Sequence, residues 1–143
     1  MLISQVLKVK GDLVFTASPD ETVAAVAAML HARRVGAMVV TQGDREVVGI
    51  VSERDVVRIV AEEGGAGLGR PVSACMTRDV IFTHPAETVD AILAQMTDRR
   101  IRHLPVCVDH RLMGIISIGD LVKAKIAETE EEAQGLRAYI SAA

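Results

Sequence analysis

Gly49-Ile50-Val51-Ser52-Glu53-Arg54-Asp55 decides the fold, because the chain returns to this stretch as Gly114-Ile115-Ile116-Ser117-Ile118-Gly119-Asp120. Each copy closes a longer matching segment, and these segments begin at Pro19-Asp20-Glu21-Thr22-Val23 and at Pro85-Ala86-Glu87-Thr88-Val89. A repeat of this length is one supersecondary unit that buries its apolar face against its twin. We therefore expect two copies of one small fold, packed against each other.

The spacing of apolar residues predicts a β-α-β-β-α order in each copy, and so an α+β fold. In the first copy we expect a helix with Ser18 as its N-cap and Gly36 at its end, followed by a helix from Ser52 to about Glu63. The strands of the first copy are predicted at 13–17, 37–41 and 47–51. The second copy is predicted to have strands at 80–83, 104–108 and 112–117, and helices over 86–97 and from Ile118 onward.

These elements divide the chain into a first repeat (1–63), a Gly-rich linker (64–71), a second repeat (72–127) and a helical extension (128–143). The first repeat includes a short lead-in helix with Leu2, Val6 and Val9 on one face, and residues 72–76 mirror it.

The last helix carries apolar and small residues at alternating spacings of four and three, a weak heptad-like row. The row consists of Val122, Ile126, Thr129, Ala133, Leu136 and Ile140. It indicates either self-association or a helix that folds back on its own core. The acidic residues Glu128 and Glu130–Glu132 are predicted to form a solvated face.

Composition excludes several classes of function. The 143 residues carry a net charge of −3 and 2% aromatic residues, which leaves no basic footprint for duplex DNA and few platforms for single strands. No uncharged apolar run approaches the ~18 residues of a membrane span, and the N-terminal residues do not have a signal-peptide pattern. Cys75 and Cys107 form no disulfide or zinc pattern and are expected to be reduced thiols. We expect a cytoplasmic protein.

The repeated Ser-x-x-Asp motif is the part of the sequence best suited to bind a ligand. A strand delivers Ser52 or Ser117 to the start of a helix, where free N–H groups and the helix dipole favour an anion. Asp55 and Asp120 lie one turn further, where a carboxylate can accept hydrogen bonds from a vicinal diol. The alternative is a capping box, which needs no ligand, and duplication would copy a cap as well.

At this point the sequence resembles the cystathionine-β-synthase (CBS) domain family. The resemblance rests on Thr16–Val23 with Val48–Asp55, and on Arg100–Val106 with Met113–Asp120. The stretch Val72–Val80 between them is also typical of the family. Together these short motifs extend over nearly the whole chain. Their order and their duplication make the resemblance specific.

The resemblance implies a tandem pair, or Bateman module, whose repeats pack with pseudo-twofold symmetry and leave two clefts. In the family such clefts bind AMP, ATP, NAD(H) or S-adenosylmethionine, with Asp on the ribose and Ser or Thr on phosphate. These roles fall on Asp55 and Asp120, and on Ser52 and Ser117. The resemblance also implies a homodimer and a regulatory role without catalysis, with no cofactor required. An effector protein is a further expected partner, and nucleic acid and membrane are not.

The two clefts are not expected to be equal. Arg102 and His103 begin a strand of the second repeat, where similar residues face phosphate in some family members; the alternative is a surface Arg and a His satisfied by backbone. Thr16 matches a Thr that is frequent in this strand of the family. In the second repeat the equivalent residue is Phe82, which would stack on a base, block the slot for the base or pack in the core. Gly119 lets a ligand come close. These differences favour the cleft of Ser117 and Asp120 as the better phosphate site.

Other constellations are weaker. His103 and Cys107 would lie ~13 Å apart on one strand, too far to share a metal ion. No Ser or Cys has a nearby base and acid at a spacing typical of nucleophilic catalysis. Two hypotheses therefore stay open: a module that senses adenosine-containing nucleotides, and a dimeric scaffold in which the Ser-x-x-Asp elements are caps only.

Overall fold

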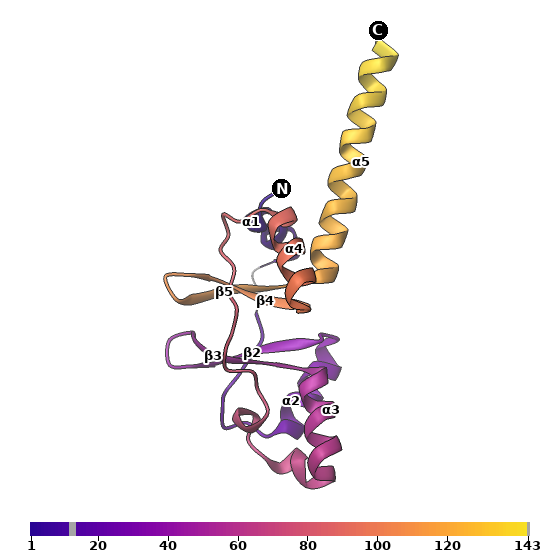
Figure 1. Ribbon diagram of the computed structural model, residues 1–143. Helices are drawn as coiled ribbons and strands as arrows, with labels where there is room; N and C mark the ends of the chain where they lie inside the picture. The colour runs from indigo at the N-terminus through magenta and orange to yellow at the C-terminus, as the bar shows by residue number, and fades with distance from the viewer. Residues whose placement is uncertain (12–13, 143) are drawn as a thin grey trace.

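The computed structural model describes residues 1–11 and 14–142. Two β-hairpins lie in the middle of the molecule, with one group of helices on each outer side and a long C-terminal helix extending away (Figure 1). The first hairpin is formed by β2 (Ala37–Gln42) and β3 (Glu46–Ser52), and the second by β4 (His103–Val108) and β5 (Arg111–Ser117). The predicted α+β architecture with an extended last helix is confirmed.

The hairpins join into one five-stranded sheet in the order β1-β2-β3-β5-β4. The two copies meet where β3 and β5 pair antiparallel at Glu46 and Arg111. Both hairpins shift register at the same repeat position, after Val40 in one and after Val106 in the other. The duplication therefore preserves even an irregularity of the backbone.

The first strand of each copy is short. β1 (Thr16–Ala17) runs parallel to β2, and the Leu13 end of the predicted strand lies outside the described residues. The strand predicted at 80–83 is wrong, because only Thr83 forms a bridge, to Val106 of β4. Thr83 bonds to the carbonyl of Pro105 and the N–H of Cys107. An extension of this ladder toward residue 81 would need the N–H that Pro105 does not have.

The first helices of the two copies, α2 (Val23–Arg33) and α4 (Val89–Arg99), begin later than predicted. Their N-caps are Thr22 and Thr88, whose hydroxyls accept from backbone N–H groups at 3.1 Å. Ser18 is not the N-cap, because residues 18–21 close a separate turn in which the Ser18 N–H donates to the Glu21 carboxylate.

The ends of these helices also differ from the prediction. Arg34, not Gly36, caps α2 in the left-handed conformation with φ of 55°, and Arg100 does the same for α4. The equivalence of the two caps follows from the repeat, since both positions are Arg.

The second helices are α3 (Glu53–Glu63) and α5 (Ile118–Ala142), and both begin directly after a Ser, as predicted. Most of the predicted linker (64–71) forms a 3₁₀-helix, η1 (Gly64–Gly69), which is followed by a shorter one, η2 (Val72–Ala74). Gly67 allows η1 to pack closely, because a Cβ there would lie 3.0 Å from the carbonyl oxygen of Ile59.

The lead-in segments are exchanged between the two copies. Ile3 and Val6 of α1 (Ile3–Lys10) are buried in the core of the second copy, beside α4 and α5 (Figure 1). Val72, Cys75 and Met76 are buried in the core of the first copy. Matched backbone bonds anchor the exchange, from Ile3 N–H to the carbonyl of Glu87 and from Val72 N–H to the carbonyl of Glu21.

The lead-in helix was assigned to the first repeat from the sequence, but in the structure it packs in the core of the second copy. Of the predicted apolar face only Val6 is buried: Val9 is 91% exposed and Leu2 is exposed, because α1 turns Ile3 and Val6 inward.

The repeated glycines of β3 and β5 are explained by this exchange. A Cβ at Gly49 would lie 2.5 Å from Sδ of Met76, and a Cβ at Gly114 would lie 2.8 Å from Cδ2 of Leu7. Each lead-in segment thus packs directly on a glycine of the opposite copy, where a side chain would prevent close approach.

Candidate functional site

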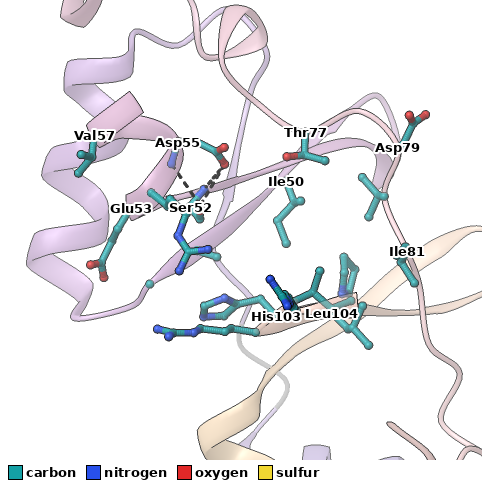
Figure 2. Close-up of a pocket in the computed structure, with 18 residues that line it drawn as sticks. Ile50, Ser52, Glu53, Asp55, Val57, Thr77, Asp79, Ile81, His103 and Leu104 are labelled. Atoms are coloured by element: carbon teal, nitrogen blue, oxygen red, sulfur yellow. Dashed lines mark hydrogen bonds between the residues drawn. The ribbon is translucent and has the colours of Figure 1, made fainter. Parts of the chain in front are cut away.

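A cavity of about 620 Å³ lies between the two copies (Figure 2). Its first wall combines the end of β3 with the start of α3, and includes Ile50, Ser52, Glu53, Arg54, Asp55 and Val57. Its second wall is the segment Arg100–Pro105 at the start of β4, and residues 77 and 79–81 close it at one side. This volume lies in the range of small-molecule sites in proteins.

Ser52 and Asp55 form a complete capping box at the start of α3. The Ser52 N–H donates to Oδ2 of Asp55 at 2.8 Å, and the Asp55 N–H donates to the Ser52 hydroxyl at 3.3 Å (Figure 2). The Ser52 hydroxyl donates to the same Oδ2 at 3.1 Å. Arg58, one turn further, pairs with Oδ1 at 3.0 Å. Both carboxylate oxygens of Asp55 are thus engaged, and its side chain is only 8% exposed.

The opposite wall supplies positive charge. Arg100 and Arg102 line the cavity from the second copy, and Arg54 lines it from the first. Arg102 is exposed, and its carbonyl accepts from the N–H of Ile118, which fixes the backbone at this position. The structure therefore brings Arg102 to the cleft of Ser52 and Asp55.

His103 is half-buried in the same wall, against Gly36. A Cβ at Gly36 would lie 3.2 Å from the Cε1 and Nε2 atoms of His103, so the glycine makes room for the ring. Burial lowers the pKa of His103 below its ordinary value, and the charge of Lys10 lowers it further. A neutral imidazole can still hydrogen-bond a phosphate, so the phosphate contact predicted for His103 does not require a charged ring.

Ser117 and Asp120 repeat the capping box but do not line this cavity. The Ser117 N–H donates to Oδ2 of Asp120 at 2.8 Å, and the Asp120 N–H donates to the Ser117 hydroxyl at 3.1 Å. The same Oδ2 also receives Lys10 of α1 at 2.7 Å. Lys10 donates to the carbonyl of Ile115 as well, at 2.8 Å, so its ammonium is held at the end of β5.

Burial alone would raise the pKa of Asp120. The hydrogen bonds from Lys10 and from Ser117 outweigh it, and the net pKa is lower than usual. Asp120 is therefore an ionised carboxylate whose partner is already present in the chain. The pattern around the motif gives no sign of this partner, because Lys10 is 110 residues away in sequence.

The other predicted residues lie apart from the cavity. Thr16 is exposed on β1, and Gly119 is exposed at the start of α5. Phe82 is 46% exposed, so it does not pack in the core, and it lines a separate cavity of about 630 Å³ with Thr83 and Cys107. Arg54 and Arg100 were not predicted as wall residues. The position of Arg100 two residues before Arg102 was a usable signal.

Three further observations limit the chemistry of the described residues. Residues 1–11 and 14–142 bring together no group of three His, Cys, Asp or Glu side chains able to hold a metal ion. Cys75 and Cys107 are both free thiols, and burial raises the pKa of each. Within the same ranges, no helix combines the length and the apolar character that crossing a bilayer requires.

Comparisons with known proteins agree with the duplicated geometry. The family model for the CBS domain matches twice, at residues 10–62 and 72–127. The mitochondrial CBS domain-containing protein CBSX3 of Arabidopsis thaliana is 36% identical over 146 residues, which cover 96% of this chain and 71% of that protein.

Solved structures share the fold. A CBS-domain containing protein from Agrobacterium tumefaciens matches with a TM-score of 0.84 and 44% identity, over 87% of this chain and 99% of that one. The CBS domain pair of protein MJ0100, in complex with 5′-methylthioadenosine and S-adenosyl-L-methionine, matches with a TM-score of 0.80 over 90% of this chain and 98% of that one. Its 22% identity shows a common fold alone.

Proposed function

The chain belongs to the CBS domain family, and from this premise we propose that it is a regulatory module that binds an adenosine-containing nucleotide between its two copies. The observation that carries the proposal is the pairing of opposite walls in one cavity. The capped start of α3 lies on one side, and Arg100 and Arg102 lie on the other.

A phosphate group fits the cationic wall. Arg guanidinium groups bind phosphate with paired, charge-assisted hydrogen bonds, and Arg102 is exposed enough to reorient. The dipole at the start of α3 adds a second source of positive potential, although the N–H groups of Glu53 and Asp55 already have partners. Glu53 and Asp79 also line the cavity, so the anion is best placed toward Arg102 and away from these acids.

The ribose fits near Asp55. Its Oδ1 is held by Arg58, which also donates to the carbonyl of Cys75 at 2.8 Å, and its Oδ2 is needed for the capping box. Each carboxylate oxygen has two lone pairs, so Asp55 can keep its cap and still accept from a ribose hydroxyl. The base would lie in the apolar part of the cavity, between Ile50, Ile81 and Leu104 (Figure 2).

The preferred cleft is opposite to the one that the sequence favoured. Sequence differences pointed to Ser117 and Asp120, but Lys10 is paired with Asp120 at 2.7 Å. A ligand hydroxyl would have to share or displace that ammonium. We therefore assign the primary site to Ser52 and Asp55 and treat Ser117 and Asp120 as a weaker site.

The ligand class is supported by chemistry and by one relative. The MJ0100 domain pair was solved with two adenosine compounds, and the cavity here offers a cationic wall, a carboxylate and an apolar slot. AMP, ATP, NAD(H) and S-adenosylmethionine are the candidates. A ligand that contacts both copies signals only if it binds one packing of the copies better than another. The receiver of such a signal would be a second copy of the chain or an effector protein.

Calorimetric titration of AMP, ADP, ATP, NADH and S-adenosylmethionine tests this proposal. We expect saturable binding of at least one compound. Arg102→Ala should raise its Kd roughly tenfold to a hundredfold, the value of one charge-assisted contact. Arg99→Ala, which removes the same charge from the end of α4 outside the cavity, should bind like the original chain. Absence of heat with all five compounds would contradict the proposal.

One observation favours a second function, a dimeric scaffold with empty clefts. Both Ser-x-x-Asp boxes are complete without any ligand, so each motif is accounted for as a helix cap. The same titration separates the two functions. The scaffold requires that none of the five compounds binds and that the chain still self-associates.

A further inference from the structure

An exposed apolar row runs along α5 and is not used by the fold of its own chain. Val122, Ile126, Leu136 and Ile140 of this row are between 45% and 64% exposed. Their spacing of four and three residues, continued through Thr129 and Ala133, keeps them on one side of the helix. Figure 1 shows that the second half of α5 extends beyond every other element.

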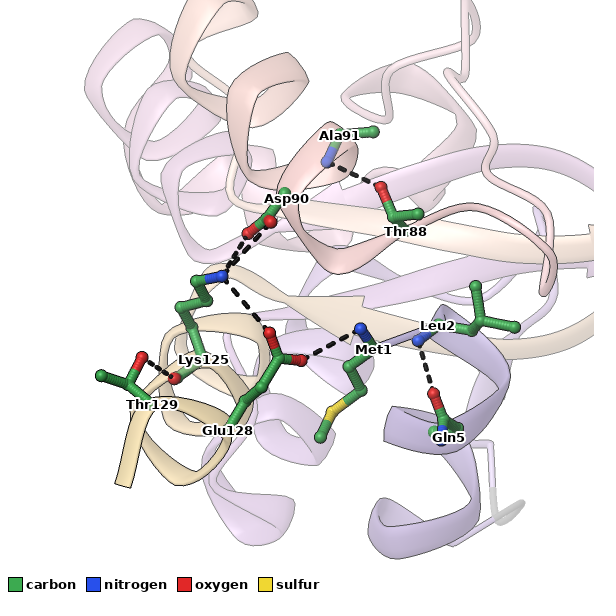
Figure 3. Close-up of polar contacts among 9 residues, drawn as sticks. All are labelled: Met1, Leu2, Gln5, Thr88, Asp90, Ala91, Lys125, Glu128 and Thr129. Atoms are coloured by element: carbon green, nitrogen blue, oxygen red, sulfur yellow. Dashed lines mark hydrogen bonds and ion pairs between the residues drawn. The ribbon is translucent and has the colours of Figure 1, made fainter. Parts of the chain in front are cut away.

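The base of α5 is fixed by its opposite side. Leu121 is fully buried and Ala124 packs against the core of the second copy. Lys125 pairs with Asp90 of α4 at 2.9 Å, and Glu128 pairs with Lys125 at 3.4 Å (Figure 3). On a helical projection Leu121, Ala124 and Glu128 lie about 100° or more from the centre of the apolar row, and Lys125 lies at its edge, about 60° from the centre. The row therefore faces outward from a rigidly held helix. Glu128 is part of this anchor and not of the solvated face that the sequence predicted.

The polar member of the row does not oppose burial. The hydroxyl of Thr129 donates to the carbonyl of Lys125 at 2.9 Å, so it already has a partner within the helix (Figure 3). Ala133 is small and allows two helices to approach closely. Both residues weaken the row, but neither leaves a group that would be unsatisfied on association.

The charged residues beside the row favour a second, parallel copy of α5 as its partner. In a parallel, in-register pair of helices, a residue beside the seam meets the residue five positions further along the partner. This rule places Glu132 of each copy against Arg137 of the other, which gives two attractive pairs. Lys125, a second cation beside the row, is already paired with Asp90.

The antiparallel arrangement is opposed by the same charges. Alignment of Ile126 with Leu136 of a second copy would place Glu130 against Glu130 and Glu132 against Glu132. Like charges at such positions are destabilising. Orientation is thus encoded in Glu130, Glu132 and Arg137.

We propose that α5 associates with α5 of a second copy as a parallel, in-register coiled coil over residues 122–140. The two domain pairs then lie at the same end of the assembly, with their α5 bases side by side. This inference does not rest on nucleotide binding and would hold if the clefts stayed empty.

Sedimentation equilibrium over a range of protein concentrations tests the association. The original chain is expected to dimerise. Leu136→Glu should raise the dimer Kd by about a hundredfold or more, because it places two carboxylates in the seam. Ala138→Glu adds the same charge on the far side of the helix and should leave the Kd within about threefold. A monomeric original chain, or an unchanged dimer in Leu136→Glu, overturns the proposal.

Charge reversal tests the orientation. In the parallel pair Arg137→Glu replaces two attractions by two repulsions and should raise the dimer Kd roughly tenfold. The exchange Glu132→Arg with Arg137→Glu should restore it. In the antiparallel pair Arg137 lies beside Lys123, so Arg137→Glu would tighten the dimer. Tighter association, or no rescue by the exchange, overturns the parallel arrangement.

Disulfide trapping gives a readout that does not depend on affinity. In a Cys107→Ser background, Leu136→Cys should form an inter-chain disulfide under mild oxidation, because parallel helices bring position 136 against itself. Ala138→Cys is the matched control and should form no inter-chain disulfide. Efficient trapping of a mixture of Ile126→Cys and Leu136→Cys chains, without trapping of Leu136→Cys alone, would show antiparallel helices and overturn the proposal.

Discussion

The two Ser-x-x-Asp motifs have the same local structure and different neighbours. In each, the Ser N–H donates to the Asp carboxylate at 2.8 Å, and the Asp N–H donates back to the Ser hydroxyl. Asp55 is paired with Arg58, which lies one turn away in the same helix. Asp120 is paired with Lys10, which lies on a helix near the other end of the chain.

Duplication has thus copied the cap but not the environment of the cap. A cap depends on a few neighbouring residues and so survives in both copies. The cation that holds the Asp is not copied: in the second copy it is Lys10, which is 110 residues away in sequence.

The largest expected effect concerns the two acids. Asp55→Asn should raise the Kd of the tightest nucleotide in the calorimetric panel by roughly a hundredfold, because a charged acceptor of the ribose is lost. Asp120→Asn should change it by about threefold or less, since Lys10 already holds that acid. Asn retains an oxygen for the cap, so both variants should fold, which circular dichroism will check. Equal losses in the two variants would remove the distinction between the clefts.

The repeated glycines should differ in stability. Gly49→Ala is expected to lower the free energy of unfolding by about 2–3 kcal/mol, because its Cβ meets the carbonyl oxygen of Thr77 at 3.0 Å as well as Met76. Gly114→Ala should cost about 1 kcal/mol, because its Cβ meets only the side chain of Leu7, which can rotate away. Urea denaturation gives both values. A greater cost at Gly114 would show that α1 is the more rigid lead-in segment.

Removal of Lys10 should make the clefts more alike. Lys10→Met keeps the length of the side chain and releases Asp120, whose pKa should rise toward its ordinary value because the ammonium is gone. The pair is partly exposed, so stability should fall by only about 0.5–1 kcal/mol. Calorimetry should then detect a second nucleotide per chain. Lys8→Met, on the same helix and without this pairing, is the control, and a stoichiometry of one in Lys10→Met would count against the role of Lys10.

The smallest effect is the pH dependence of His103. Its folded pKa lies below the unfolded value of 6.5, so the unfolded chain takes up the proton more readily. Stability from this group is therefore complete above pH 6.5 and declines as the pH falls from 6.5 toward the folded pKa. His103→Gln should flatten this part of the profile, measured by urea denaturation between about pH 5 and 8. An identical slope in the variant would show that another group is responsible.

The sequence predicted the parts of the fold that depend on nearby residues. The hairpins, the start of α3 at Ser52 and the start of α5 after Ser117 follow from apolar spacing and caps, and the structure confirms them. The caps at Ser18 and Gly36 were wrong for a local reason. Ser18 and Glu21 satisfy each other in a turn of their own, and an Arg adopts the left-handed conformation expected of glycine.

The site was predicted only in part, because its decisive contacts are long-range. The Ser-x-x-Asp residues and the Arg102 wall were identified, but the sequence did not say which wall faces which motif. Arg102 meets the Ser52 motif across the interface between the copies, and Lys10 reaches Asp120 across 110 residues. Such contacts arise from the packing of the two copies, and periodicity within one copy contains no information about them.

The exchange of lead-in segments has a consequence for the order of synthesis. When residues 1–63 leave the ribosome, their core still lacks Val72, Cys75 and Met76, which are made later. Ile3 and Val6 are synthesised before the residues of the second copy that bury them, of which Leu121 is the last. Until then, the nascent chain holds these two apolar residues without their native burial site. For the same reason, a protease cut within residues 64–69 would produce two fragments, each of which contains part of the other's interior.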